Sequence, residues 1–470
     1  MIFSSIPFMF YFLPAVILLY FAVPKVLKNT VLLLTSLFFY GWGEPKFVVF
    51  MVLSIVQGYV FGLLIEKHRG SKRSKVFLTA SVVLSLGLLG YCKYADFFIK
   101  NFSALTGLSM PLLGIALPIG ISFYTFQILS YAVDVYRGDT EAQKNPIDLG
   151  AYIAMFPQLI AGPIVRYSDI ATQLKERTHS FEKVSYGVRR FVIGLSKKIL
   201  IADIMGEAVK IFLDSSEKTF VFYWLYAIAY VLQIYFDFSG YSDMAIGLGS
   251  IFGFKFMENF NYPYISRSVT EFWRRWHMSL GTWFRDYLYI PMGGNRVSKL
   301  RWFFNIFVVW MATGFWHGAD WSYIIWGLYF AVFLIVEKEW ILSLIKKYKV
   351  AQIIYIPILL VIIITSFVIF HSSDSGIPIF ESLRVLFTGQ GVPFSNAESL
   401  YYLRNYLGVI LIGIVAATPL GTSLTRKIRT TKWGAVTLDI LEPVVLTALL
   451  LVCTAYLVDG SFSAFLYYKF

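Results

Sequence analysis

Charge is what this sequence has least of. Only 15% of its 470 residues are charged, whereas soluble globular domains carry roughly 25%. Hydrophobic residues make up 57% of the chain and aromatic residues 19%, and the mean hydropathy is +0.66. These values exclude an ordinary soluble domain and predict an integral membrane protein.

Cysteine is also scarce, and the usual metal-binding patterns are missing. Cys92 and Cys453 both lie in apolar runs, which favours small packed side chains over a disulfide or a metal pair. No Cys-x-x-Cys or His-Glu-x-x-His motif occurs, so we expect no metal site. Residues 1–24 lack the positive n-region of a signal peptide, which predicts a retained first span with its N-terminus outside.

The chain has 28 acidic residues and 41 basic ones, which gives a net charge of +13. In a soluble protein this excess would suggest nucleic acid as a partner. Here the positive-inside rule explains it, because Lys25 and Lys28 and the basic loop 67–75 lie two spans apart, on one side of the membrane. We therefore expect a cytoplasmic face there, a multi-pass protein of the cell membrane surrounded by lipid, and no nucleic acid partner.

Long uncharged runs give the organisation of the chain. A helical span needs about 20 apolar residues, so we expect about eleven spans. Some of the shorter runs would be too short to cross the membrane unaided, or would be re-entrant. We find no internal repeat or low-complexity linker, so residues 1–470 are predicted to form a single domain. The uncharged runs are Met1–Pro24, Asn29–Gly43, Phe47–Ile65, Val76–Cys92, Asn101–Val133, Leu149–Val165, Thr219–Phe236, Trp302–Ala319, Trp321–Val336, Ile353–Phe370, Asn405–Thr425 and Pro443–Val458.

The stretch from Tyr241 to Arg301 mixes apolar residues with charged ones. Within residues 271–287, Trp276, Leu280 and Trp283 recur at helical spacing, with arginines beside them. This pattern predicts an amphipathic helix in the membrane interface or half-buried against the bundle.

Two of the five histidines are candidates for chemistry. His317 lies inside an apolar run, and an ionisable group at membrane depth marks a functional site by default. His277 follows a tryptophan, as His317 does. His68 and His179 lie in polar loops, where we expect them to be solvated, and His371 lies at the end of a span.

Further polar residues fall at membrane depth and together suggest a polar path, although packing alone explains each of them. Gly240 among them is a candidate helix break. Proline interrupts two of the apolar runs, and irregular backbone in the bilayer must face protein or a water-filled cavity. The candidate path residues are Tyr124, Gln127, Gln158, Asp237, Arg274, Asp286, Trp316, Asp320 and Trp321.

Three segments resemble the membrane-bound O-acyltransferase superfamily and, within it, the membrane subunits of alginate O-acetyltransferases. They are Glu271–His277, Asp286–Gly294 and Gly314–Gly318. The segment Ser36–Lys46 is similar to that family too.

The resemblance implies a fold, a site and a reaction. The fold would be all-α, a ring of about eleven transmembrane helices with re-entrant and amphipathic helices around a central funnel. His317 would be the catalytic residue. The likeness also implies acetyl-coenzyme A as donor with no tightly bound cofactor, an exported polysaccharide as final acceptor, and an extracytoplasmic SGNH-type acetyltransferase as partner, with polysaccharide export machinery as a further partner.

Acyl transfer to a hydroxyl needs a base and a means of stabilising the oxyanion. Our hypothesis is that His317 is that base or positions the acceptor. His277 would be a catalytic partner that relays the proton or supports His317 from the next layer of residues. Trp316 and Trp321 would exclude water, and Gly314 and Gly318 would allow close helix packing. The cations Arg189, Arg190, Lys197 and Lys198 could attract coenzyme A phosphates, although the positive-inside rule also explains them.

Other functions remain open from the sequence. One is D-alanyl or another acyl transfer to a cell-wall polymer from a carrier protein, within the same superfamily. A membrane transporter is an alternative of another class, which predicts matching broken helices in repeated halves, and we see none. A structural scaffold is a further alternative.

Overall fold

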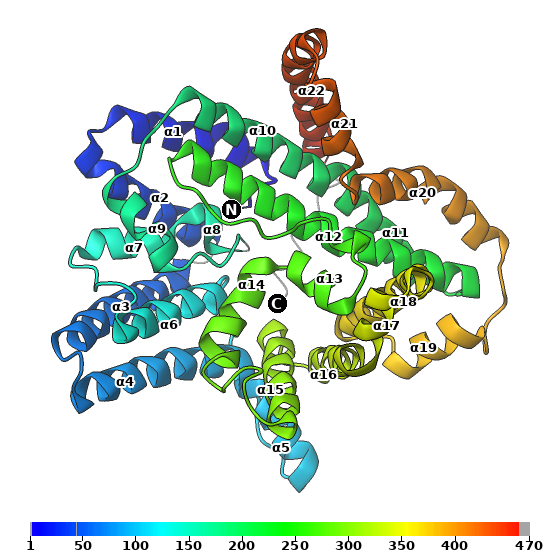
Figure 1. Ribbon diagram of the computed structural model, residues 1–470, viewed down its shortest axis with the longest axis horizontal. Helices are drawn as coiled ribbons and strands as arrows, with labels where there is room; N and C mark the ends of the chain where they lie inside the picture. The colour runs from blue at the N-terminus through cyan, green and yellow to red at the C-terminus, as the bar shows by residue number, and fades with distance from the viewer. Residues whose placement is uncertain (1, 44, 161, 460–470) are drawn as a thin grey trace. The chain divides into compact units, whose positions relative to one another are not determined.

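The computed structural model describes residues 2–43, 45–160 and 162–459, and within these ranges it contains helices and no strands (Figure 1). Among the described residues, six helical stretches are long and apolar enough to cross a membrane. A shorter apolar helix covers Pro7–Ala22. The protein is therefore a multi-pass membrane protein. The six stretches are Pro45–Lys67, Lys72–Thr106, Phe220–Ile251, Lys349–Ser375, Ala397–Ala416 and Lys432–Val458.

The chain divides into two compact units, and we describe each by itself. Among the described residues, unit 1 comprises 2–191 and 241–257, and unit 2 comprises 192–240 and 258–459. Two helices, α10 (Phe181–Lys197) and α12 (Phe220–Ile251), contribute residues to both units. The single domain over 1–470 stays a prediction.

Unit 1 holds the N-terminal helices, and α3, α4 and α6 pack against one another in it. Gly62 of α3 allows this approach, because a Cβ there would lie 2.6 Å from the Tyr131 hydroxyl of α6. The α-helices that lie wholly in this unit are α1 (Leu13–Ala22), α2 (Lys28–Gly43), α3 (Val48–Lys67), α4 (Lys72–Leu89), α5 (Ala95–Thr106), α6 (Ile121–Arg137), α7 (Pro146–Ala154), α8 (Phe156–Leu159) and α9 (Tyr167–Lys175).

Two apolar runs of this unit do not form continuous helices. The run Asn101–Val133 is interrupted between α5 and α6 by residues 107–120, and Gly107 and Gly120 at its ends have φ of 73° and 74°. The run Leu149–Val165 is split at Met155 and ends beyond α8 in an irregular segment. Glycine adopts positive φ without strain, so Gly107 and Gly120 permit the first of these breaks locally.

Unit 2 holds the rest of the helices and a large core of aromatic and aliphatic side chains. In this unit α15 and α16 are antiparallel neighbours. Its α-helices are α11 (Ile204–Asp214), α13 (Val269–Arg275), α14 (Met278–Phe284), α15 (Lys299–His317), α16 (Trp321–Val336), α17 (Leu342–Lys347), α18 (Lys349–Ser375), α19 (Ile379–Thr388), α20 (Ala397–Ala416), α21 (Leu420–Ile428) and α22 (Lys432–Val458).

Glycines bring α15 and α16 into backbone contact. A Cβ added to Gly314 would overlap the carbonyl oxygen of Tyr323, and one added to Gly327 would overlap that of Trp310. Small residues permit such approach between membrane helices, where packing rather than hydrophobic burial drives association. The predicted close approach at Gly314 is confirmed, and Gly327 on the facing helix is its counterpart.

Two local predictions are wrong. The amphipathic helix over 271–287 is broken at His277, which adopts φ 44° and ψ 54°, so that α13 and α14 are separate helices. The Asn259 carbonyl accepts the Met278 N–H at 2.9 Å and stabilises the break. Gly240 does not end a helix, because α12 continues through it; a Cβ there would lie 2.7 Å from the Gly194 carbonyl oxygen.

The α15–α16 contact can be tested by one added methyl group. Overpacking costs about 1–3 kcal/mol, so we expect Gly327→Ala to lower the apparent Tm of the purified protein. The matched control is Gly408→Ala in α20, where nothing lies within 4 Å of the new Cβ and the Tm should hold or rise slightly. Equal Tm values for the two variants would contradict this packing.

Candidate active site

His317 is the last residue of α15 and lies in a box of aromatic rings. The ring centroid of Trp316 is 5.0 Å from that of His317, that of Trp326 is 5.1 Å away and that of Phe370 is 5.3 Å away. Only 6% of His317 is exposed. The box comes from α15, α16 and α18, so three helices together hold the imidazole and exclude bulk water from it.

His277 lies at the break between α13 and α14 and is buried. Its Nδ1 lies 3.1 Å from Asn259 Oδ1, which also accepts the Ser279 hydroxyl at 2.9 Å. Because an amide oxygen only accepts, Nδ1 carries the proton, and the lone pair is on Nε2. Burial lowers the pKa of His277 to about 3, so the imidazole is neutral at physiological pH.

Trp316 contacts both histidines. The His277 ring centroid lies 6.1 Å from that of Trp316, whose other neighbour is His317. The two Trp-His segments, 40 residues apart in the sequence, therefore meet at one indole. This convergence is a feature of the tertiary structure that no local pattern in the sequence shows.

His277 lines a cavity of about 620 Å³. Three cations line it, Arg274, Arg285 and Lys338, and burial followed by repulsion from Arg274 lowers the pKa of Lys338. Thr313, one turn before His317, lines it as well. The rest of its wall is largely apolar and includes Trp273, Leu280, Phe284, Ile306, Val309, Trp310 and Leu334.

Glu337 fixes α13 beside this cavity. Its side chain is fully buried and accepts the backbone N–H groups of Val269 and Thr270 together with the hydroxyls of Thr270 and Tyr355. It thus satisfies orphan donors at the first turn of α13 from another helix. The sequence analysis missed Glu337; its position at the end of an apolar run, where an acid is costly, was the available signal.

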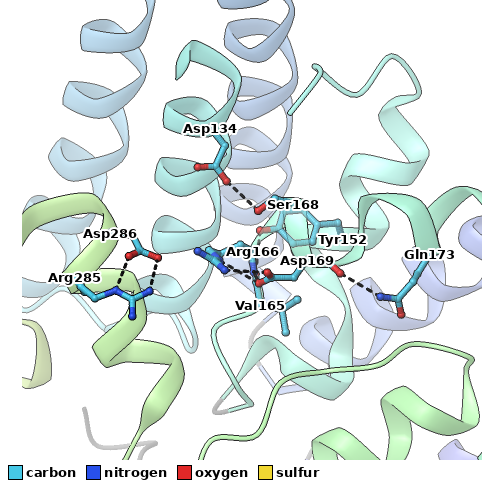
Figure 2. A network of polar contacts seen from close by, with 9 residues as sticks. All are labelled: Asp134, Tyr152, Val165, Arg166, Ser168, Asp169, Gln173, Arg285 and Asp286. Atoms are coloured by element: carbon cyan, nitrogen blue, oxygen red, sulfur yellow. Dashed lines mark hydrogen bonds and ion pairs between the residues drawn. The ribbon is translucent and has the colours of Figure 1, made fainter. Parts of the chain in front are cut away.

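The other predicted residues near this site have varied environments. Asp320 caps the N-terminus of α16, where its carboxylate accepts the Ser322 N–H at 2.8 Å. Trp321 is 56% exposed, and it is Trp326 that packs against His317. Asp286 forms a bidentate pair with Arg285, at 2.7 and 3.2 Å (Figure 2).

Asp237 lies in a buried ion cluster of unit 2. Lys198 Nζ lies 2.9 Å from Asp237 Oδ1 and 2.5 Å from Asp203 Oδ1. Burial alone would lower the pKa of Lys198, but the two carboxylates outweigh it and raise that pKa. Lys198 is thus enclosed, and Arg190 pairs with Asp243 at 2.6 Å, so both cations already have carboxylate partners within the protein.

Tyr124, Gln127 and Gln158 belong to unit 1, where all three are buried. Gln158 donates to the Tyr152 carbonyl at 2.7 Å, and the Tyr152 hydroxyl donates to the Val165 carbonyl (Figure 2). The Tyr124 hydroxyl and the Gln127 amide oxygen have no hydrogen-bond partner among the described residues. Their role in a substrate path stays a prediction.

Two further histidines lie against tyrosines, although the sequence predicted solvation for His179. His179 lies 3.0 Å from the Tyr20 hydroxyl. His371 is buried, with Nδ1 2.8 Å from the Tyr226 hydroxyl and its ring stacked 4.0 Å from that of Tyr230. The spacing of the two tyrosines, i and i+4 on α12, was the sequence signal for a shared partner.

The class of protein follows from similarity to known proteins. Residues 141–373 match the model of the membrane-bound O-acyltransferase family, and the chain belongs to that family. It is therefore an O-acyltransferase of the membrane-bound class.

Individual relatives cover much of the chain. The probable alginate O-acetylase AlgI of Pseudomonas syringae pv. tomato is 43% identical over 423 residues, which is 89% of this chain and 79% of the relative. The peptidoglycan O-acetyltransferase of Helicobacter pylori is 36% identical over 72% of this chain and 71% of its own. The teichoic acid D-alanyltransferase of Bacillus subtilis is 32% identical over a stretch that covers 49% of this chain and 61% of the relative.

The neutral state of His277 leads to a pH prediction. A group with a pKa of about 3 does not titrate between pH 5 and 8, so it adds no ionisation to the pH dependence of acyl transfer. We expect His277→Gln to lower kcat/KM but to keep the midpoint of its pH profile within about 0.3 unit of wild type. A midpoint displaced by a unit or more would contradict a neutral His277.

Proposed function

We propose that this protein is a membrane O-acetyltransferase that moves an acetyl group from a cytoplasmic thioester across the membrane for O-acetylation of an exported polysaccharide. The observation that carries the proposal is His317, held in an aromatic box and separated by the Trp316 indole from His277, which lines the cavity. Relatives named for acetylation of alginate and of peptidoglycan support the acetyl group and the polymer.

The proposed reaction transfers one proton and one acyl group. His317 accepts the proton of the attacking hydroxyl as its oxygen bonds to the thioester carbonyl carbon. The tetrahedral intermediate collapses, the carbon–sulfur bond breaks, and the thiolate leaves and takes up the proton. The products are an ester and a free thiol, with His317 neutral again.

His277 has a different role in this scheme. A neutral imidazole with a pKa of about 3 is a poor base at pH 7. Its contact with Trp316 instead makes it a positioning residue, since that indole also contacts His317. The buried Asn259 and Ser279 hydrogen bonds fix its ring orientation.

The direction of transfer rests on charge. The cations Arg274, Arg285 and Lys338 line the cavity. Lys299, the first residue of α15, pairs with Glu339 just beyond the end of α16, so these two ends of the α15–α16 hairpin lie together. By the positive-inside rule this end of the hairpin faces the cytoplasm, and with it the donor side. The donor is acetyl-coenzyme A, the membrane is the cell membrane, and the N-terminus is outside.

The partners follow from the same scheme. The acetyl group leaves the outer side of the site for an extracytoplasmic SGNH-type acetyltransferase, which completes transfer to the polymer, close to the polysaccharide export machinery. Helices arranged as a ring of about eleven spans around a funnel would bring the two sides of the membrane near His317.

D-alanyl transfer is the alternative within the family. The D-alanyltransferase of Bacillus subtilis aligns with only 49% of this chain, whereas the acetylating relatives named above align with 72% or more. This difference favours acetyl as the cargo.

The test is polymer-bound acetate in cells that carry wild type, His317→Ala or His68→Ala. Removing a general base costs typically 10²–10⁴-fold, so we expect His317→Ala to abolish detectable acetate at equal membrane levels. His68, in a loop between α3 and α4, is the matched control and should retain acetate.

The competing outcomes have separate meanings. Acetate retained in His317→Ala cells would refute the catalytic assignment. If wild-type cells carry D-alanyl esters in place of acetate and lose them with His317→Ala, the cargo is wrong and the site is right.

A further inference from the structure

A groove in unit 2 gathers positive charge at the start of a membrane span. Its volume is about 490 Å³, and it lies between α17, the first turn of α18 and the residues that begin α13. We call it the cationic groove. Its lining residues are Arg267, Ser268, Glu271, Leu342, Ile345, Lys346, Lys347, Lys349 and Gln352.

The positive charge of the groove is not neutralised from within. Its four cations are exposed, and in the described parts of the chain they form no ion pair. The one carboxylate of the groove, Glu271, already pairs with Arg275 at 2.8 Å and accepts the backbone N–H of Arg267. The groove therefore favours an anionic ligand. The four cations are Arg267, Lys346, Lys347 and Lys349.

The groove lies where the chain enters the membrane. Lys349 and Gln352 belong to the first turn of α18, which is one of the six stretches able to cross a membrane. Trp340 and Tyr348, on either side of α17, are both exposed. Exposed tryptophan, tyrosine and lysine are typical of the boundary between a membrane and water. These residues indicate that the groove opens at the level of the lipid headgroups.

An apolar stripe leads away from the groove along α18. Val350, Ile354 and Ile358 recur every four residues on one face of this helix, and all three are exposed. Within the groove, Leu342 and the buried Ile345 supply apolar lining next to the cations. A hollow with cations at one end of an apolar stripe matches a ligand with an anionic head and apolar chains.

We propose that the cationic groove binds the phosphate of an anionic phospholipid, whose acyl chains lie along the exposed stripe of α18. Lysine and arginine clustered beside a membrane span attract anionic headgroups, and basic pockets between such helices bind them. Ammonium and guanidinium groups form charge-assisted hydrogen bonds with phosphate oxygens. This lipid site is separate from the proposed acyl transfer and does not depend on it.

The surroundings of the groove favour a lipid over other anions. A soluble phosphate would use the cations and leave the adjoining apolar stripe without a role. A protein partner would need an interface of about 800 Å² on each side, which is larger in kind than a groove lined by nine residues. The positive-inside rule requires cations near a span, but it does not require a hollow that collects four of them from three parts of the chain.

The test measures lipid binding to purified full-length protein in a neutral detergent by native mass spectrometry. Phosphatidylglycerol is the anionic probe, and phosphatidylcholine is the zwitterionic one. In Lys346→Gln/Lys347→Gln we expect the Kd of the first bound phosphatidylglycerol to rise about tenfold or more, because two of the four cations are lost. Binding of phosphatidylcholine should not change.

Three further variants keep the result interpretable. Lys346→Arg/Lys347→Arg keeps the charge and should bind phosphatidylglycerol as wild type does. Lys72→Gln/Lys75→Gln removes the same charge from exposed residues of the α3–α4 region and should leave the Kd within about twofold of wild type. Arg267→Gln, from a different part of the groove, should repeat the loss if the double glutamine variant does not accumulate.

The contrary outcomes are distinct. An unchanged Kd in both groove variants would overturn the proposal. Equal losses from the groove and from the α3–α4 region would show a general attraction to basic surfaces and overturn it as well. Glycerophosphoglycerol, which is the same headgroup without acyl chains, should not displace the lipid. Displacement by this compound or by coenzyme A at a concentration comparable to that of the lipid would make the groove a site for soluble phosphates and refute the lipid.

Discussion

The backbone contact between α15 and α16 is the constraint on which the site depends. Gly314 and Gly327 bring the two helices closer than any side chain would allow, and this closeness sets Trp326 against His317. Phe370 of α18 closes the box. In a bilayer, apolar side chains gain little by leaving lipid for protein, so close packing of this kind supplies much of the association between helices.

The second half of the site depends on a break in a helix. His277 occupies a left-handed backbone conformation, which costs a non-glycine residue roughly 1–3 kcal/mol. The hydrogen bonds from Met278 and Ser279 to Asn259, and the buried Glu337 that caps α13, offset this cost. Strain held by surrounding contacts is common at functional sites, and here it turns His277 toward Trp316.

Charged side chains of unit 2 occupy two kinds of environment. Lys198, Asp203 and Asp237 neutralise one another inside the protein, and breaking such a cluster by removing one partner leaves an unpaired buried charge. The cations around the cavity, Arg274, Arg285 and Lys338, are arranged differently, since they line open space. This contrast separates the lysines and arginines that hold the fold from those that can meet an anionic ligand.

The sequence by itself determined the membrane class, the helical composition and His317 as the leading candidate, because hydropathy and a titratable group in an apolar run are local properties. One apolar run matches α16 residue for residue, and another matches α15 to within three residues at either end. Only the tertiary structure decided that His277 interrupts a helix, that Asp237 is paired with Lys198, and that Trp326 packs against His317 where Trp321 was expected. Each of these depends on partners distant in the sequence, such as Asn259 or Gly327, and helical periodicity carries no information about which distant residues meet.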